Sequence, residues 1–200
     1  MWVLIFFMKH VILITGTPCV GKTTVAKQFA DRLNASYINL TDYAKQNGLI
    51  LGEDAKRHTA IVDEEKMRQM LVGTINQMQC SVVVDGHFAA SVVPNGLSTC
   101  VFVLRRNPVE LKEYMKKEAF SEDKLYENLL AEILDVCLVE ALEVQNGKVC
   151  EIDVTGKAVE EIIDELFAIA LGEKACFCGG VVDWLGFLDR EGLLNQYIKN

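Results

Sequence analysis

The stretch "VILITGTPCVGKTT", residues 11–24, decides the fold. It begins with a continuous apolar run, Val11–Ile14, which is typical of a parallel strand buried on both faces. Residues 16–23 then match the pattern G-x-x-x-x-G-K-[ST], and apolar side chains recur at helical spacing over residues 21–33. Strand, glycine-bearing loop and helix follow in the order that a phosphate-binding loop requires, so we predict a nucleotide site here.

The predicted loop holds phosphate mainly through its backbone. Successive N–H groups point at phosphate oxygens, and the helix that begins near Gly21 adds its positive end. We expect Lys22 to bridge the β- and γ-phosphates and to take part in catalysis. The hydroxyl of Thr23 is expected to bind Mg²⁺, and Thr24 to reach the α-phosphate.

Cys19 is an unusual residue for the middle of such a loop. A residue other than glycine is tolerated there if its φ is negative or mildly left-handed, and a left-handed residue costs roughly 1–2 kcal/mol. A thiol beside inward-pointing amides and Lys22 is expected to have a lowered pKa. This interpretation predicts that oxidation of Cys19 impairs nucleotide binding.

Four more strands are predicted after the loop. They are apolar segments at residues 37–40, 82–85, 100–106 and 149–156, the last including its exit loop. Helical patterns separate them along the chain. Strands alternating with helices predict an α/β fold of the P-loop NTPase type, with a doubly wound five-stranded parallel sheet.

Three other segments have predicted local structures. Thr41 and Asp42 are expected to cap a short helix that runs through Lys45. Residues 47–58 read as a polar, glycine-bearing loop. Residues 121–145 are predicted to form one long amphipathic helix.

Several polar residues fall at the carboxyl ends of the predicted strands. These are Gly16, Asp85, Arg105 and Thr155, and open α/β sheets bind ligands at this edge. Asp85 ends an apolar strand, as in a Walker B motif, so its carboxylate is expected to hold a Mg²⁺-bound water. His87 either orients a water or accepts a proton, or it is a loop histidine hydrogen-bonded to the backbone.

The composition limits the classes of function. The chain has 200 residues, half of them hydrophobic, which suits one domain at residues 9–171 with an appendage at 172–200. A net charge of −8 and a pI near 5.0 argue against a general nucleic-acid coat protein. The seven cysteines are odd in number and scattered, so we expect a reducing, cytoplasmic compartment and no disulfide framework.

The two ends of the chain differ from the domain between them. "MWVLIFFMKH", residues 1–10, is too short to cross a bilayer and poor as a signal peptide, so no membrane attachment is expected and Met8 is interpreted as the true first residue. An apolar cluster at residues 184–188 either packs back on the domain or docks on a partner. Cys176 and Cys178 lack the further ligands that a metal site needs.

Six motifs together resemble one family. They are "ILITGTPCVGKTTVAKQFA", "LTDYAKQNGL", "IVDEEK", "VVVDGH", "VFVLRRNP" and "AEILDVCLVEA". In order and spacing they resemble the archaeal adenylate kinases and their eukaryotic nuclear adenylate kinase-like relatives, which act in small ribosomal subunit maturation. The resemblance covers residues 9–171 and implies a nucleoside monophosphate kinase-like fold with a short lid.

The resemblance also implies roles for individual positions. The ATP-phosphate positions of the family fall on Cys19, Gly21, Lys22, Thr23 and Thr24. Residues 39–62 match the segment that folds over the nucleoside monophosphate, and residues 117–127 match the lid. Asp85 and His87 match the family's aspartate and histidine, which handle Mg²⁺, water and ATP hydrolysis.

The start of the lid departs from the family pattern. The family has Arg-Gly-Tyr, whose arginine contacts ATP, whereas this chain has Glu118, Ala119 and Phe120. A carboxylate at an ATP-binding position repels the triphosphate. A replacement cation is therefore expected from among Lys116, Lys117, Arg105 and Arg106. Because cations stabilise the transferring phosphoryl group, a slow kinase step is expected even with ATP bound.

Two activities with Mg-ATP are implied by the resemblance. The first is a broad-specificity nucleoside monophosphate kinase, ATP + AMP = 2 ADP, with Thr41, Lys45 and Arg105 as acceptor-side candidates, each of which is otherwise an ordinary surface residue. The second is an ATPase switch that releases a small-subunit ribosomal protein of the S11 family during rRNA processing. The acidic chain suits a basic protein partner, and the sequence carries no strong signal for direct nucleic-acid binding.

A third interpretation is a nucleotide-binding scaffold that has lost its activity. Cys19 and Glu118 support it, because both depart from the family pattern at ATP-binding positions.

Overall fold

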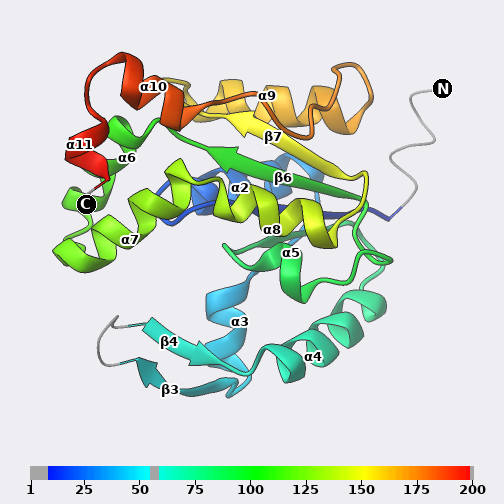
Figure 1. Ribbon diagram of the computed structural model, residues 1–200. Helices are drawn as coiled ribbons and strands as arrows, with labels where there is room; N and C mark the ends of the chain where they lie inside the picture. The colour runs from blue at the N-terminus through cyan, green and yellow to red at the C-terminus, as the bar shows by residue number, and fades with distance from the viewer. Residues whose placement is uncertain (1–8, 55–58, 199–200) are drawn as a thin grey trace.

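A five-stranded parallel sheet forms the centre of the molecule, and helices cover both of its faces (Figure 1). The computed structural model describes residues 9–54 and 59–198. The strands lie in the order β2-β5-β1-β6-β7, so the chain starts in the middle and winds outward in both directions. The predicted doubly wound fold is therefore confirmed.

The elements have the following bounds. The sheet consists of β1 (Val11–Thr15), β2 (Ser36–Asn39), β5 (Val82–Asp85), β6 (Cys100–Arg105) and β7 (Val149–Asp153). The main helices are α2 (Lys22–Leu33), α3 (Leu40–Gln46), α4 (Glu64–Gln77), α5 (Ala89–Val92), α6 (Pro108–Lys117), α7 (Glu122–Ile133), α8 (Val136–Val144) and α9 (Val159–Ala170). A separate hairpin is formed by β3 (Ile50–Asp54) and β4 (Thr59–Val62), and the tail carries α10 (Trp184–Arg190) and α11 (Leu194–Tyr197).

The central strands are buried because helices pack on both faces of the sheet. Every residue of β1 and β5 is buried, as their continuous apolar runs predict. Helices α2, α7 and α9 form one core with the sheet, and α4, α5 and α8 form the other. In the register of β1, Ile14 lies opposite Asp85 on one side and Phe102 on the other. The loops after these strands therefore leave the sheet at the same edge, which positions the site.

The predicted loop at residues 47–58 is wrong over most of its described part. Ile50–Asp54 pairs antiparallel with Thr59–Val62 and projects away from the sheet below α3 (Figure 1). The sequence of β3 lacks the alternation of apolar and polar residues that marks a half-buried strand, because most of this strand is exposed. Backbone pairing holds the hairpin, so the apolar pattern could not predict it. The part of the prediction at residues 55–58 lies outside the described residues.

The predicted long helix at residues 121–145 is also wrong, because it is two helices. Asp135 has a φ of 58°, in the left-handed region, and separates α7 from α8. Aspartate tolerates this conformation better than most residues, and its carboxylate pairs with buried Arg105. Helix α3 likewise begins earlier than predicted. Its cap is Asn39, whose side chain accepts a hydrogen bond of 3.0 Å from the Asp42 N–H.

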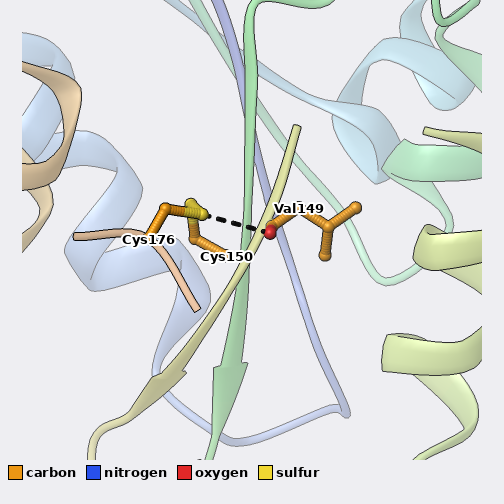
Figure 2. Close-up of a disulfide and its surroundings, with 3 residues drawn as sticks. All are labelled: Val149, Cys150 and Cys176. Carbon is orange, nitrogen blue, oxygen red and sulfur yellow. Dashed lines mark hydrogen bonds between the residues drawn. A yellow bond between two sulfur atoms is a disulfide. The ribbon is translucent and has the colours of Figure 1, made fainter. Parts of the chain in front are cut away.

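The tail folds back on the domain. Leu188 and Tyr197 are buried in the core that contains α2 and α9, so the packing alternative is confirmed. The expectation of no disulfide is wrong, because Cys176 is bonded to Cys150 of β7 (Figure 2). The carbonyl of Phe177 accepts a hydrogen bond of 2.8 Å from the Glu151 N–H, so the tail runs alongside β7 and brings the two sulfurs together. They are 26 residues apart, and only the fold reveals their proximity.

Over residues 9–54 and 59–198, no helix combines the length and apolar character that a bilayer span needs. The interpretation of residues 1–8 lies outside the described residues.

Candidate active site

The loop after β1 has the backbone that a phosphate cradle requires. Gly16 has a φ of 135°, and a Cβ added there would lie 2.4 Å from the carbonyl oxygen of Leu104. Only glycine fits this approach of loop to strand. Gly21, with a φ of 103°, directly precedes α2, so the positive end of that helix opens onto the loop.

Cys19 has a φ of 69°, the left-handed geometry that the sequence analysis allowed. The expectation of a lowered thiol pKa is wrong. Burial raises the pKa of Cys19, and the attraction of Lys22 only partly opposes this effect. The Glu118 carboxylate raises the pKa further. Because the neutral thiol is favoured, the expected sensitivity to oxidation loses its basis.

Lys22 is buried at the first turn of α2. Its ammonium donates a hydrogen bond of 2.8 Å to the carbonyl of Thr17, within the loop. Burial lowers the pKa of Lys22, whereas the nearby Cys137 and Asp85 oppose the shift. A bound triphosphate would add negative charge at this position and favour the ammonium form.

Asp85 is held by several hydrogen bonds at this edge of the sheet. It is buried at the end of β5, and its Oδ2 accepts hydrogen bonds from three side chains. The donors are the hydroxyl of Thr23 at 2.8 Å, the hydroxyl of Tyr37 at 2.9 Å and the amide of Asn39 at 2.8 Å. The predicted magnesium residues, Thr23 and Asp85, are thus in direct contact.

Tyr37 and Asn39 were missed by the sequence analysis. They are two residues apart on β2 and therefore face the same side of the sheet. Asn39 lies opposite Asp85 in the register of β2 and β5. Their spacing of two residues indicates that both side chains lie on one face of a strand. It points to Asp85 only once β2 is known to pair with β5. Burial and the bond to Asp85 raise the pKa of Tyr37, so it remains a protonated donor.

His87 follows Asp85 at the same edge. It keeps one side at the surface, yet the surrounding protein lowers its pKa to about 4, first through desolvation and then through Lys22. Its imidazole is therefore neutral at pH 7 and able to accept a proton. Its backbone carbonyl accepts a hydrogen bond of 2.8 Å from Thr15, which anchors the loop that carries it.

A cleft opens beside the phosphate loop. It has a volume of about 600 Å³, within the range of ligand pockets. One side is formed by the predicted ATP-phosphate positions Cys19, Gly21, Lys22, Thr23 and Thr24. The rest of the lining includes the cations Arg106 and Lys157, the rings of Tyr114 and Phe120, and the carboxylate of Glu118. Phosphate groups on the loop would therefore share the cleft with two cations, two aromatic rings and one carboxylate.

Four cations were expected as replacements for the missing lid arginine, and of these Arg106 lines the cleft. Its Nε donates a hydrogen bond of 3.2 Å to the Val20 carbonyl, and it pairs with Glu110. Its guanidinium carbon lies 4.9 Å from the centre of the Tyr114 ring. This planar cation is fixed beside the loop and can stack on a base or contact phosphate.

Arg105 does not lie on the acceptor side. It is 1% exposed, and its guanidinium donates to Glu132, Glu151 and Asp135. The three carboxylates hold it inside the domain. Arg105 was predicted as an acceptor-side residue and as a replacement for the lid arginine. Both predictions are wrong, because its charge is matched by carboxylates in the interior. Arg105 ends β6 and is buried, whereas the next residue, Arg106, lines the cleft. The sequence alone did not distinguish them.

The chain is similar in sequence and in fold to known proteins. A family model described as an AAA domain matches residues 12–135. The chain is 38% identical over 173 residues to the "Putative adenylate kinase" of Methanocaldococcus jannaschii, covering 86% of this chain and 92% of that protein. It is 39% identical over 175 residues to the "Putative adenylate kinase" of Thermococcus kodakarensis, covering 87% and 92%.

The chain belongs to the family of these archaeal adenylate kinase homologues. Solved structures agree on the fold alone. A shikimate kinase from Acinetobacter baumannii in complex with shikimate superimposes with a TM-score of 0.60 at 15% identity, over 84% of this chain and 97% of that one. A shikimate kinase from Bacteroides thetaiotaomicron gives 0.56 at 18% identity, over 80% and 97%. Family and fold support a phosphotransferase with a P-loop nucleotide site.

Residues 117–127, which the resemblance matches to a lid, begin with a tight turn between α6 and α7. Glu118 is the C-cap of α6, Ala119 has a φ of 54°, and Ser121 is the N-cap of α7. The left-handed position is the one where the resembled pattern has glycine, so alanine is strained there. Glu118 is exposed and lines the cleft, which places a carboxylate where nucleotide phosphates are expected.

The acceptor-side candidates Thr41 and Lys45 are exposed on α3. A second hollow of about 310 Å³ lies nearby, and its lining comes from Tyr37, Asn39, Asp42, Tyr43, Gln46 and Thr74, with Ile38 and Met78. Thr41 and Lys45 are not part of that lining. The structure places them on the segment 39–62, beside the hollow rather than in it.

Proposed function

We propose that the protein is a broad-specificity nucleoside monophosphate kinase that transfers the γ-phosphoryl group of ATP to AMP. One observation carries the proposal. Lys22, Thr23 and Asp85 meet at the carboxyl edge of the sheet, beside a cleft of about 600 Å³. Phosphoryl transfer depends mainly on positioning and charge stabilisation, and this arrangement supplies both.

The donor side follows from the loop. Its backbone N–H groups bind the phosphates, and Lys22 moves from the Thr17 carbonyl to the β- and γ-phosphates. Arg106, which lines the cleft beside the loop, contacts ATP and takes the place of the missing lid arginine. The bond from the γ-phosphorus to the bridging oxygen breaks, and a bond to an AMP phosphate oxygen forms, so two ADP result.

The residues fit a magnesium ion. Thr23 donates its hydrogen to Asp85, which leaves the hydroxyl oxygen lone pairs available to a cation. Over residues 9–54 and 59–198, no cluster of three or more His, Cys, Asp or Glu could hold a metal alone. Mg²⁺ suits such a site because it shares its coordination with phosphates and waters, and when bound it neutralises charge on the phosphates. Thr23 would bind it directly and Asp85 through a water.

The acceptor binds on the segment 39–62 in this proposal. Thr41 and Lys45 lie on α3 between the sheet edge and the β3–β4 hairpin, so a cationic and a hydroxyl group are available to the AMP phosphate. An AMP phosphate oxygen is already anionic at neutral pH. The kinase reaction therefore needs no base to remove a proton.

A second activity, ATP hydrolysis, is supported by His87. Attack by water requires a proton acceptor, and the imidazole of His87 is neutral because its pKa is lowered to about 4. His87→Asn is expected to reduce ADP formation without AMP about tenfold and to leave the AMP-dependent rate within twofold. Equal loss of both rates would contradict the separate role of His87.

A role in small-subunit maturation, through a ribosomal protein partner of the S11 family, remains part of the proposal. It is supported by the family resemblance and by the net charge of −8, which complements a basic protein.

The experiment follows ADP formation by chromatography with Mg-ATP, with and without AMP. Lys22→Ala serves as the inactive variant, and Lys66→Ala, an exposed lysine on α4, is the matched control. Wild type and Lys66→Ala should form ADP in proportion to AMP, whereas Lys22→Ala should lose about 10²-fold or more. ADP formation that ignores AMP would overturn the kinase proposal in favour of hydrolysis. ADP formation that survives Lys22→Ala would overturn the site itself.

A further inference from the structure

A buried carboxylate, Glu132, joins three parts of the fold. It lies on α7, is 1% exposed, and accepts hydrogen bonds from four donors. Its Oε1 accepts from Arg105 Nε at 3.0 Å, from the Arg106 backbone N–H at 3.0 Å and from the Trp184 indole at 3.1 Å. Its Oε2 accepts from the hydroxyl of Thr17 at 2.5 Å. One side chain thus connects the end of β6, the tail and the phosphate loop.

Thr17 is the connection to the phosphate loop. It is 1% exposed, its hydroxyl is bound to Glu132, and its carbonyl accepts the Lys22 ammonium at 2.8 Å. The same carbonyl accepts the N–H of Val20 at 3.4 Å, which closes a turn of the loop. Glu132 therefore fixes the residue around which the loop is folded, although Glu132 is outside the cleft lining.

Trp184 is the connection to the tail. It is 6% exposed at the start of α10, and this helix packs against α7 near the C-terminal end of the chain (Figure 1). The preceding segment is tied to the sheet by the Cys150–Cys176 disulfide. It is tied again by the Val181 N–H, which donates a hydrogen bond of 2.8 Å to Glu151.

The charges explain why the tail donors matter. Arg105 is one buried cation among the carboxylates of Glu132, Glu151 and Asp135. Three carboxylates around one guanidinium leave negative charge that needs further hydrogen-bond donors. The tail supplies two, the indole of Trp184 to Glu132 and the N–H of Val181 to Glu151. A docked tail therefore holds Glu132 in the orientation that accepts the Thr17 hydroxyl.

We propose that the C-terminal tail is a positioning element of the nucleotide site, acting through Trp184, Glu132 and Thr17. None of these three side chains is a catalytic residue. They hold the phosphate loop in its binding conformation, so that tail docking and nucleotide binding favour each other. The inference rests on the proposed nucleotide site. Coupling of this kind is reciprocal, so bound nucleotide must also stabilise the docked tail.

The test measures the Kd of Mg-ATP in a double-mutant cycle. Thr17→Val removes the hydroxyl at nearly constant volume, and Thr17→Ser keeps it. Trp184→Phe removes only the indole donor and keeps an aromatic ring. Phe177→Leu, at an exposed position of the same tail, is the matched control. Thermal unfolding of each variant, measured without nucleotide, confirms that it is folded.

The expected values follow from loop preorganisation. A loop that is competent about one tenth of the time binds about tenfold more weakly, and we expect this for Thr17→Val. Trp184→Phe should weaken binding about threefold, because Glu132 keeps its other donors. The double variant should weaken binding about tenfold rather than about thirtyfold, since both changes break one chain of contacts. Thr17→Ser and Phe177→Leu should remain within twofold.

A spectroscopic readout tests the reciprocal effect. The chain has two tryptophans, so in a Trp2→Phe background Trp184 is the one that remains. Mg-ATP should change the emission of Trp184 with the same Kd as direct binding. Two results would overturn this inference and leave the proposed function standing, provided that wild type binds Mg-ATP. One is a Kd of Trp184→Phe within twofold of wild type, and the other is a double variant whose loss of affinity is the product of the two single losses. If wild type does not bind Mg-ATP, the proposed function is overturned with this inference.

Discussion

Replacing Asp85 by asparagine separates the chemistry of the site from its architecture. The carboxylate is 1% exposed, and one oxygen accepts three hydrogen bonds of 2.8 to 2.9 Å. Asparagine has nearly the same size and keeps one oxygen to face the same donors. It removes the charge that orients the Thr23 hydroxyl and a magnesium-bound water. Asp85→Asn should therefore reduce catalysis strongly while the protein still folds.

The magnitudes can be worked from these contacts. A hydrogen bond to a charged group contributes about 1.5–3 kcal/mol and a neutral one about 0.5–1.5 kcal/mol, so three weakened bonds cost at most about 3–5 kcal/mol. Release from burying a charge offsets part of this loss. Loss of one preorganised electrostatic group typically lowers kcat by about 10²–10³. We therefore expect a drop in kcat of about that size and a Tm lowered by at most about 20 °C.

The assay combines initial rates at saturating Mg-ATP and AMP with thermal unfolding. Tyr37→Phe is the matched variant, because it removes one of the three donors and leaves the Asp85 charge in place. It should lower kcat by less than about tenfold. An Asp85→Asn enzyme whose kcat stays within tenfold of wild type, while it remains folded, would refute the role assigned to the carboxylate.

Three other predictions follow from the site and the tail. Glu118→Arg should lower the KM for ATP about threefold to tenfold, because it replaces a repulsive charge in the cleft by an attractive one near solvent; an unchanged or higher KM would contradict the placement of the lid. The folded-state pKa of His87 lies below its ordinary value, so the unfolded chain binds the extra proton first and stability should fall as pH drops from about 6.5 toward 4. Urea unfolding across this pH range should show that loss in wild type and a smaller one in His87→Asn, and equal slopes would refute it. Cys176→Ser should lower the free energy of unfolding by about 2–4 kcal/mol, because the disulfide closes a chain separation of 26 residues; chemical denaturation without reductant measures it, and an unchanged midpoint would show that the bond contributes nothing.

The central sheet was predictable because its signals are local. Apolar runs that end in Gly16 and Asp85 marked buried strands, and the loop between Gly16 and Thr23 marked the phosphate cradle. Placement at the carboxyl edge then followed from the rule for parallel sheets. Thr23 and Asp85, which the sequence predicts as magnesium residues, meet at this edge for the same reason.

The remaining features depend on contacts between distant segments. Arg105 and Arg106 are neighbours in sequence, yet one lies among three carboxylates and the other lines the cleft. The break at Asp135 is set by that buried arginine and not by helical propensity, so periodicity could not reveal it. The bond from Trp184 to Glu132 spans 52 residues and has no local pattern. Sequence reasoning finds the motif, whereas the shell that holds the motif is a product of the fold.

The central claim is that the γ-phosphoryl group moves from ATP to a nucleoside monophosphate at this site. The most direct test uses ATP labelled in its γ-phosphate, with Mg²⁺ and AMP, and separates the labelled products over time. The account predicts that label enters ADP as its β-phosphate, at a rate that rises with AMP and is lost in Lys22→Ala. Label that appears only as inorganic phosphate, at a rate that ignores AMP, would contradict it.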